Sequence, residues 1–459
     1  MSRNTYIGFF FAVFIITTAV TPPPGLNEEN LIPLWGPLER IRADNRWICT
    51  AFASGLIAMC LNHGSRFAAR GSGSLVILLL ALHSLILVKN VAAVGLVALF
   101  YFTGLIVMIS ATRLVAGKTV ADQPPGKTDC WKPLVVASFG FLAANLLQYL
   151  INPAATMVVS NRFSGITCNP QMYALATAVL VPALLFQYAN DHRLVSRAIV
   201  LFAFFVLVFF VVLSGSRLSL LLSAFSVLMF YRAKLAQLAK FALPVVLLAV
   251  LFLMFGENLP LDPESRIAST TNTRSDVWQR QVDGILAHPI FGQQLEAGQR
   301  LGFGENSYLA AGVAVGLPGL FLVLGVAFLI LRQLLSLMQL EHRLGWRPEL
   351  ALPIAVLSAC LLGAFFEAFL LGIFTLPLTA LLYTVFISEA MIQRLSHRPA
   401  TAPTSLPPQF QKKRKSRLRF SPAVSLSRYS GNRQVTSVHR PYWGISPTKV
   451  KPRPGAPNQ

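Results

Sequence analysis

Four arginines in this sequence have chemistry that packing alone does not explain. Arg162, Arg217, Arg274 and Arg280 fall on the side of the predicted helices that the charge pattern below places outside the cytoplasm, where positive residues are uncommon. A guanidinium keeps its charge at physiological pH and carries N–H donors in a planar fork that fits phosphate oxygens. In SGSRLSLLL, Arg217 sits between two apolar runs with almost no loop. Its side chain therefore either lies among lipid headgroups or turns inward to bind an anionic ligand.

Glu305, Glu367 and His288 are the residues best placed for acid–base chemistry. Glu367 in GAFFEAFLLG is well inside an apolar run, where burying a carboxylate costs free energy. This acid therefore either has a functional role or forms an ion pair with one of the arginines. Glu305 in GFGENSYLAAG either acts on a substrate hydroxyl or favours a helix start through the helix dipole. His288 precedes Pro289 in the turn-like HPIFG.

Motifs for metals and nucleotides are missing from the sequence. Its five cysteines form no C-x-x-C pair and no Cys/His cluster at metal-ligand spacing, so neither a disulfide framework nor a zinc site is predicted. The sequence also contains no G-x-x-x-x-G-K-[ST], D-x-D, H-E-x-x-H or G-x-S-x-G. We expect no metal and no cofactor, and cytoplasmic nucleotide chemistry is unsupported.

The apolar stretches that must position these residues predict a polytopic membrane protein. The 459 residues are 54% hydrophobic and 12% charged, and the mean hydropathy is +0.59; these values disfavour disordered, secreted disulfide-bonded and soluble enzyme classes. The runs are too long and too uniformly apolar for barrel strands. We therefore predict an all-α bundle of about twelve transmembrane helices. The predicted spans are residues 5–20, 47–62, 74–89, 91–112, 133–151, 170–188, 196–214, 217–231, 239–256, 307–331, 350–370 and 373–392.

Charge predicts the orientation of this transmembrane domain, residues 1–392. Lys and Arg resist translocation, and an even number of spans places both termini on one side. The predicted inner loops hold 14 bases against five acids, whereas the large outer loop 257–306 holds seven acids against four arginines. We therefore place both termini in the cytoplasm and this loop on the extracytoplasmic face. The N-terminus is interpreted as a retained helix, since no convincing signal-peptide cleavage site precedes the prolines at 22–24.

Residues 393–459 are predicted to form a disordered, basic cytoplasmic tail, because they lack apolar periodicity. Residues 394–459 hold 14 of the 39 Lys and Arg residues and no Asp or Glu. The tail thus explains most of the net charge of +21. Beside the inner leaflet, each nearby base would attract anionic lipid by about 1 kcal/mol. Nucleic-acid binding is the weaker interpretation, and no nucleic-acid partner is expected.

Three stretches together resemble the O-antigen ligase and polymerase superfamily, membrane enzymes that move glycans from polyprenyl diphosphate carriers on the extracytoplasmic face. NRFSGITCNPQMYALATAVLVPALL is similar to the family's Arg-x-Ser-Gly and Asn-Pro element, and SGSRLSLLL is the second stretch. The third is TRSDVWQRQVDGILAHPIFGQ followed by ENSYLAAGVAVGLPGLFLVL, which is similar to the family's Arg-x3-Trp, His-Pro-x-x-Gly and His-Asn-x-x-Leu sequence. The resemblance covers residues 155–335.

The resemblance implies roles for the residues above. Arg217 and Arg274 would hold the donor diphosphate, and Arg280 is a substitute candidate one helical turn further on. Further substrate-binding candidates are Arg162, Asn306, His288 and Glu367.

The chain departs from the family at the expected base, since the family's ligases have His where this chain has Glu305. Either Glu305 is a working substitute, or His288 approaches the site, or the protein is inactive.

The function implied is metal-independent glycosyl transfer in a bacterial inner membrane. An acceptor sugar hydroxyl would attack a polyprenyl-diphosphate-linked oligosaccharide, and the missing His favours a polymerase of O-antigen or exopolysaccharide over a ligase. The expected partners are this donor, a glycan or lipid-linked acceptor, and anionic lipid at the tail. Two alternatives stay open: a lipid-linked glycan flippase or exporter without covalent chemistry, although no convincing internal repeat is found, and a scaffold that recruits cytoplasmic partners through its tail.

Overall fold

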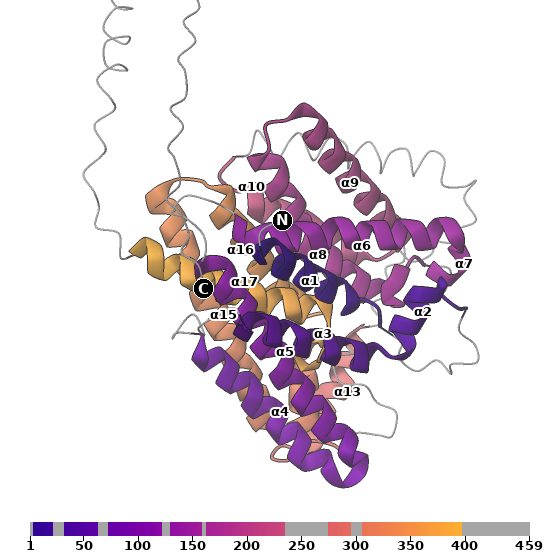
Figure 1. Ribbon diagram of the computed structural model, residues 1–459. Coiled ribbons are helices and arrows are strands. Elements are labelled where there is room, and N and C mark those ends of the chain that lie inside the picture. The colour runs from indigo at the N-terminus through magenta and orange to yellow at the C-terminus, as the bar shows by residue number, and fades with distance from the viewer. Residues whose placement is uncertain are drawn as a thin grey trace, which may run out of the picture. The chain divides into compact units, whose positions relative to one another are not determined.

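The computed structural model is all-helical over the part of the chain that it describes (Figure 1). The described residues are 3–21, 32–62, 72–121, 129–157, 162–234, 274–294 and 305–396. None of them forms a β-strand, which confirms the predicted fold class for this part of the chain. The chain divides into a unit Met1–Pro399 and a unit Ala400–Gln459, and every described residue belongs to the first.

Seven of the described helices are long and apolar enough to cross a membrane, so the chain is a membrane protein. These seven are α4 (Gly73–Val94), α5 (Leu96–Ala121), α6 (Lys132–Ile151), α8 (Pro170–Asn190), α9 (Leu194–Leu213), α15 (Leu317–Leu344) and α17 (Leu376–Ser396). Three shorter apolar helices are α1 (Arg3–Thr17), α10 (Arg217–Tyr231) and α16 (Pro348–Ala364). The other described α-helices are α2 (Gly36–Ala43), α3 (Asn45–Asn62), α7 (Pro153–Thr156), α13 (Arg274–Ala287) and α14 (Ser307–Val315).

Most of the predicted spans agree with the helices where the chain is described. Eleven of the twelve fall on described helices, and α10 matches the prediction residue for residue. The remaining span, 239–256, lies outside the described residues, as do residues 257–273 and 295–304 of the large loop and the tail beyond residue 396. The topology of twelve spans therefore stays a prediction.

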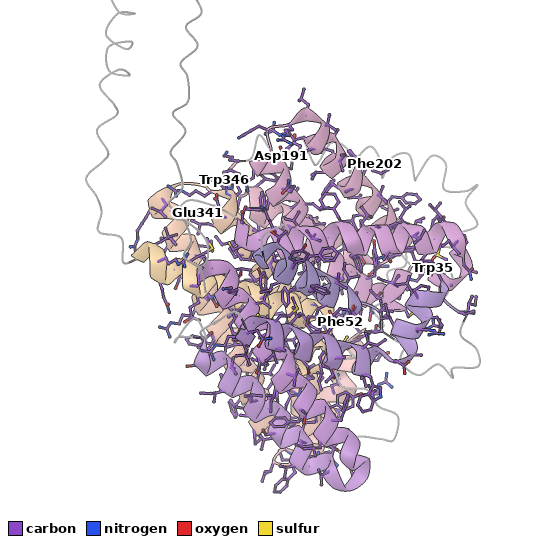
Figure 2. The ribbon with its side chains drawn as sticks, in the orientation of Figure 1. Trp35, Phe52, Asp191, Phe202, Glu341 and Trp346 are labelled. Carbon is purple, nitrogen blue, oxygen red and sulfur yellow. The ribbon has the colours of Figure 1, made fainter. Side chains whose placement is uncertain are left out.

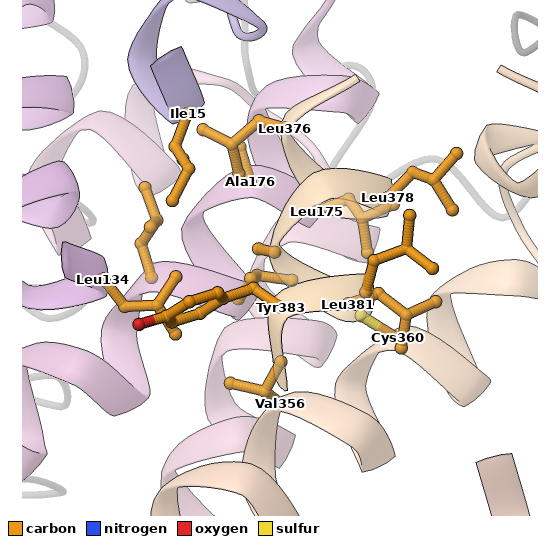
Figure 3. Close-up of a cluster of buried hydrophobic side chains, with 14 of the residues drawn as sticks. Ile15, Leu134, Leu175, Ala176, Val356, Cys360, Leu376, Leu378, Leu381 and Tyr383 are labelled. Atoms are coloured by element: carbon orange, nitrogen blue, oxygen red, sulfur yellow. The ribbon is translucent and has the colours of Figure 1, made fainter. Parts of the chain in front are cut away.

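Helix α8 lies in the centre of the bundle because it is apolar on all sides. Its residues from Pro170 to Phe186 are buried apart from Gln171, as expected for a helix without a polar face. Figure 3 shows the adjoining core, in which Tyr383 of α17 lies among side chains from the neighbouring helices. The Tyr383 hydroxyl donates to the carbonyl of Cys130 at 2.6 Å, which satisfies its polar end within the core.

Helices α8, α10 and α16 are packed so that the starts of α8 and α10 and the end of α16 lie at one end of the bundle. At this end the amide of Phe163, just before α8, donates to the carbonyl of Leu213 at 3.1 Å. A Cβ on Gly363, near the end of α16, would collide with Leu175, near the start of α8. We call it the arginine end, because Arg162 and Arg217 lie there.

The other end of the same helices is the Trp346 end. The Trp346 indole, just before α16, donates to the carbonyl of Phe230, near the end of α10, at 3.1 Å. In Figure 2, Trp346, Glu341 of α15 and Asp191 at the end of α8 lie toward one side of the molecule, and Trp35 lies toward the other. Glu341 forms a salt bridge with Arg232, which directly follows α10.

The predicted span 307–331 is wrong as a single helix, because the helix breaks at Gly316. Gly316 has φ 76° and ψ −162°, and it separates α14 from α15. The turn after α13 fits into this break: the amide of Leu317 donates to the carbonyl of Pro289 at 2.7 Å. A Cβ on Gly316 would lie 2.5 Å from that same carbonyl oxygen. The backbone packs closely along this glycine-rich segment, since a Cβ on Gly319 would lie 2.5 Å from the carbonyl oxygen of Ala311.

The predicted span 350–370 also ends earlier than expected. Helix α16 stops at Ala364, and the chain continues as an irregular segment that includes the 3₁₀ turn Phe369–Leu371. Glu367 therefore lies beyond the end of the helix and not on one of its faces. This segment, residues 365–372, is called the Glu367 segment below.

Replacing Gly316 with Ala should destabilise the protein more than replacing Gly345 with Ala. Both glycines have positive φ, 76° and 78°, so each substitution strains the backbone by about 1–3 kcal/mol. Space is open around Gly345, whereas a Cβ on Gly316 meets backbone at 2.5 Å. The clash should cost about 1–3 kcal/mol more. Thermal unfolding in detergent micelles measures the difference; equal melting temperatures for G316A and G345A would contradict the role assigned to the break.

Candidate functional site

Arg162 joins the segment before α8 to the turn that precedes α10. Its Nε donates to the carbonyl of Ser214 at 2.8 Å. Ser216 then caps α10, since its Oγ accepts from the amide of Ser219 at 3.3 Å. Arg217 follows as the first residue of α10, and its side chain is exposed. Two of the predicted arginines are thus held close together by the chain geometry at the arginine end.

The Ser-Gly and Asn-Pro residues of the first family-like stretch have structural roles here. Asn169 caps α8, because its Oδ1 accepts from the amides of Gln171 at 2.8 Å and Met172 at 3.4 Å. Gly165 has φ 56°, and any Cβ there would collide with Asn145. The Oδ1 atom of that asparagine accepts from the amide of Ile166 at 3.0 Å. These contacts fix the backbone that carries Arg162.

Arg274 binds the Glu367 segment from outside the bundle. Its Nη1 donates to the carbonyl of Phe366 at 3.1 Å, and its Nη2 lies 3.7 Å from Oε1 of Glu367. The guanidinium also lies over the Phe366 ring, 5.2 Å from its centroid. One helical turn further along α13, the Trp278 ring lies 6.3 Å from the same phenylalanine ring. The side chain of Glu367 is only 2% exposed, and its ion pair with Arg274 is the arrangement that one of the two interpretations of this acid expected.

Ser307 attaches the Glu367 segment to α14, and sequence analysis did not identify it. Its Oγ donates to the carbonyl of Glu367 at 2.6 Å and accepts from the amide of Leu370 at 3.4 Å. The Tyr308 ring packs 4.8 Å from the ring of Phe365. A serine at a helix start gives no sequence signal for a partner 60 residues away.

Glu305 and Asn306 turn the chain into α14. Asn306 has φ 68°, and its Oδ1 caps the helix by accepting from the amides of Tyr308 at 2.9 Å and Leu309 at 3.1 Å. The amide contacts give Asn306 a positioning role. Gln281 of α13 donates from Nε2 to the carbonyl of Glu305 at 2.9 Å. Together these contacts hold the Glu305 carboxyl group at the start of α14.

The Glu305 carboxyl group combines burial with a neighbouring positive charge. Burial raises its pKa above the ordinary range, and the Arg274 guanidinium acts in the opposite direction. Glu305 also interacts electrostatically with Glu367. Its Oε2 is buried and has no hydrogen-bond partner among the described residues. An oxygen in this condition can accept a proton or a hydrogen bond from a ligand hydroxyl.

His288 and Arg280 lie apart from this cluster. Helices α13 and α14 run side by side, with Gln281 beside Glu305 near one end and the amide of Gln293 bonded to the carbonyl of Val313 at the other. His288 is exposed near the second end, about 13 Å along α14 from Glu305 at 1.5 Å per residue. Arg280 is exposed, and its Nε donates to a carbonyl of its own helix at 3.2 Å.

Lys89 of α4 is a second residue that sequence analysis did not assign to the site. Its Nζ donates to the carbonyl of Ala314 at 2.9 Å and to the carbonyl of Gln293. The ammonium group thereby satisfies a carbonyl at the C-terminus of α14, where a cation is favourable. It also holds the turn after α13 in place. Within the described ranges, His, Cys, Asp and Glu form no group of three that could hold a metal ion.

Comparison with protein-family models and with curated proteins finds no match for this chain. The functional inference therefore depends on the arrangement of the site: Arg162 and Arg217 at the arginine end, and Arg274 beside the two carboxyl groups of Glu305 and Glu367.

Replacing Glu305 with Gln should change how stability depends on pH. Because burial raises the pKa of Glu305, the folded protein binds this proton more tightly than the unfolded chain. The stability that protonation of Glu305 gives to the folded protein is fully present below the pKa of this group in the unfolded chain. It is lost as the pH rises through the pKa in the folded protein. The melting temperature of the wild type should therefore fall relative to that of E305Q over this interval. Thermal unfolding in detergent from acidic to neutral pH measures it; parallel curves would contradict the burial of this carboxyl group.

Proposed function

We propose that this protein is a glycan transferase of the O-antigen ligase and polymerase type. It would span the bacterial inner membrane twelve times, with both termini in the cytoplasm and residues 257–306 on the extracytoplasmic face. The single observation that carries the proposal is the buried Oε2 of Glu305, which has no hydrogen-bond partner among the described residues and which feels the positive charge of Arg274. An acceptor group next to a fixed cation suits the transfer of a sugar from an anionic leaving group.

The arginines supply the binding of the donor diphosphate. Arg217 begins α10 and is exposed at the arginine end, and Arg162 is held beside the preceding turn. Arg274 lies at the start of α13, half-buried against the Glu367 segment. A guanidinium binds phosphate oxygens through paired N–H donors and stabilises the charge that develops as the diphosphate departs.

Glu305 acts as the general base in the proposed reaction. The acceptor hydroxyl gives its proton to the Glu305 carboxylate while its oxygen forms a bond to the anomeric carbon of the donor sugar. The bond from that carbon to the diphosphate oxygen breaks, and the polyprenyl diphosphate leaves with the electron pair. Burial raises the pKa of Glu305, which makes its carboxylate a stronger base than an exposed one. Glu367 serves as the counter-ion that orients Arg274.

The donor is a polyprenyl-diphosphate-linked oligosaccharide, and the acceptor is a sugar hydroxyl of a glycan or of a lipid-linked glycan. We favour a polymerase of O-antigen or exopolysaccharide over a ligase, because Glu305 stands where the ligases have His. The basic tail, residues 393–459, would lie against anionic lipid at the inner leaflet.

A lipid-linked glycan flippase or exporter is the second candidate, and the break at Gly316 favours it. Transporters frequently bind their substrates where a membrane helix is discontinuous, and α14 and α15 are separated in this way. Such a protein would use the same arginines to bind the diphosphate without breaking a covalent bond.

Replacing Arg274 with Ala should slow glycan transfer about 100-fold, because a lost charge-stabilising donor costs about 3 kcal/mol in the transition state. The measurement is mass spectrometry of polyprenyl-linked glycans from cells whose only copy is R274A, at equal protein abundance. R274K retains the charge but loses the planar fork, and should recover only part of the rate. K132A is the matched control, because Lys132 is an exposed cation that also pairs with an acid, Asp129. It lies at the start of α6, whereas Asn145, which binds the backbone before α8, lies near the other end of that helix.

The glycans that accumulate decide between the candidates. Single repeats would indicate a polymerase, and long chains would indicate a ligase. Donor retained on the cytoplasmic face would favour the exporter. A glycan profile equal to that of the wild type would exclude Arg274 from the mechanism and contradict the proposed function.

A further inference from the structure

The second half of α13 and the turn that follows it expose large apolar side chains. Val282 and Leu286 are four residues apart and therefore lie on one face of the helix; they are 36% and 72% exposed. Ile290 and Phe291 in the following turn are 63% and 76% exposed. We call these four residues the apolar edge of α13. The three of these residues furthest from Arg274 in the chain are each at least 63% exposed.

Polar side chains occupy the exposed strip next to this edge on the same helix. Gln279, Arg280 and Asp283 are all exposed, and the first and last are joined by a hydrogen bond of 2.9 Å. The third face of α13 packs on the protein, where a Cβ on Gly312 of α14 would lie 2.6 Å from the side chain of Ile285. Helix α13 thus separates polar from apolar exposed surface, as helices at a membrane interface do.

The apolar edge adjoins the start of a membrane-spanning helix. The carbonyl of Pro289 accepts from the amide of Leu317, the first residue of α15, at 2.7 Å. Helix α15 exposes a large apolar residue every three or four positions, which places these side chains on a single face. These exposed residues are Leu317, Phe321, Leu324, Phe328, Leu331 and Leu335. Because α15 is long and apolar enough to cross a membrane, lipid covers this stripe.

The length of α15 indicates the depth in the bilayer at which its first turn meets the apolar edge of α13. Its 28 residues extend about 42 Å at 1.5 Å per residue, whereas the hydrocarbon core of a bilayer is about 30 Å thick. The exposed apolar stripe runs from Leu317 to Leu335, which is about 27 Å at 1.5 Å per residue. This stripe fills the hydrocarbon core, so the first turn of α15 lies near the boundary between acyl chains and headgroups. The apolar edge, bonded to that first turn, lies at the same level.

We propose that the apolar edge is a membrane-docking surface, which seats the second half of α13 in the headgroup and acyl boundary of the leaflet at the arginine end. Lipid is the occupant because the edge continues the lipid-covered stripe of α15 and because its three most exposed residues lie beside Pro289, which is bonded to that helix. The bilayer then holds α13 on one side, while Arg274 and Gln281 hold it to the bundle on the other. This inference does not depend on the proposed glycan chemistry.

Nitroxide spin labels test the proposal in the full chain, reconstituted into nanodiscs of phosphatidylethanolamine and phosphatidylglycerol. The labelled variants are L286C and F291C on the apolar edge and R280C on the polar side of the same helix. The unsubstituted protein measures background labelling, since its five cysteines are buried. Collision with oxygen, which concentrates in the bilayer, is compared with collision with a water-soluble nickel chelate.

We expect L286C and F291C to collide more with oxygen than with the chelate, and R280C to show the reverse. Equal, water-like collision with both reagents at all three positions would overturn the proposal. Exclusion of both reagents from L286C and F291C would also overturn it, because it would show that a second copy or another protein covers the edge. Two labelled positions keep the test decisive if one variant fails to fold.

Discussion

The buried carboxyl group of Glu367 is the constraint on which the arginine end depends. A charge with 2% of its side chain exposed is costly to desolvate unless a counter-ion and hydrogen bonds compensate. Arg274 supplies the charge, and Ser307 fixes the backbone of the same residue. One buried acid therefore joins three separate pieces of chain: the start of α13, the start of α14 and the segment after α16.

Backbone geometry then places the remaining groups around this acid. Asn306 at φ 68° turns the chain into α14, so that Glu305 faces the same guanidinium. Gly316 ends that helix after nine residues and admits the turn that follows α13. Lys89 of α4 donates to the carbonyl of Ala314 at the C-terminus of α14. The electrostatics of Glu305, with burial and Arg274 acting in opposite directions on its pKa, follow from these local geometries.

Composition and periodicity predicted the positions of the helices, which depend on local sequence. Eleven of the predicted apolar runs fall on described helices, and α10 was found to the residue. Charge against hydropathy identified Glu367 as a possible ion-pair partner of one of the arginines, without revealing that this arginine is Arg274. Ser307 and Lys89 were missed because their partners lie 60 and 225 residues away, and such contacts leave no local pattern. The break at Gly316 was missed because hydropathy continues through it, although the glycine itself was a signal.

Binding of the donor diphosphate is the central claim, and native mass spectrometry of the purified protein tests it most directly. The wild type should retain polyprenyl diphosphate more strongly than polyprenyl monophosphate. The double variant R217A/R274A should bind the diphosphate at least about 100-fold more weakly, since each charged donor contributes about 1.5–3 kcal/mol. Equal affinity of the wild type and the double variant for the diphosphate would contradict the account.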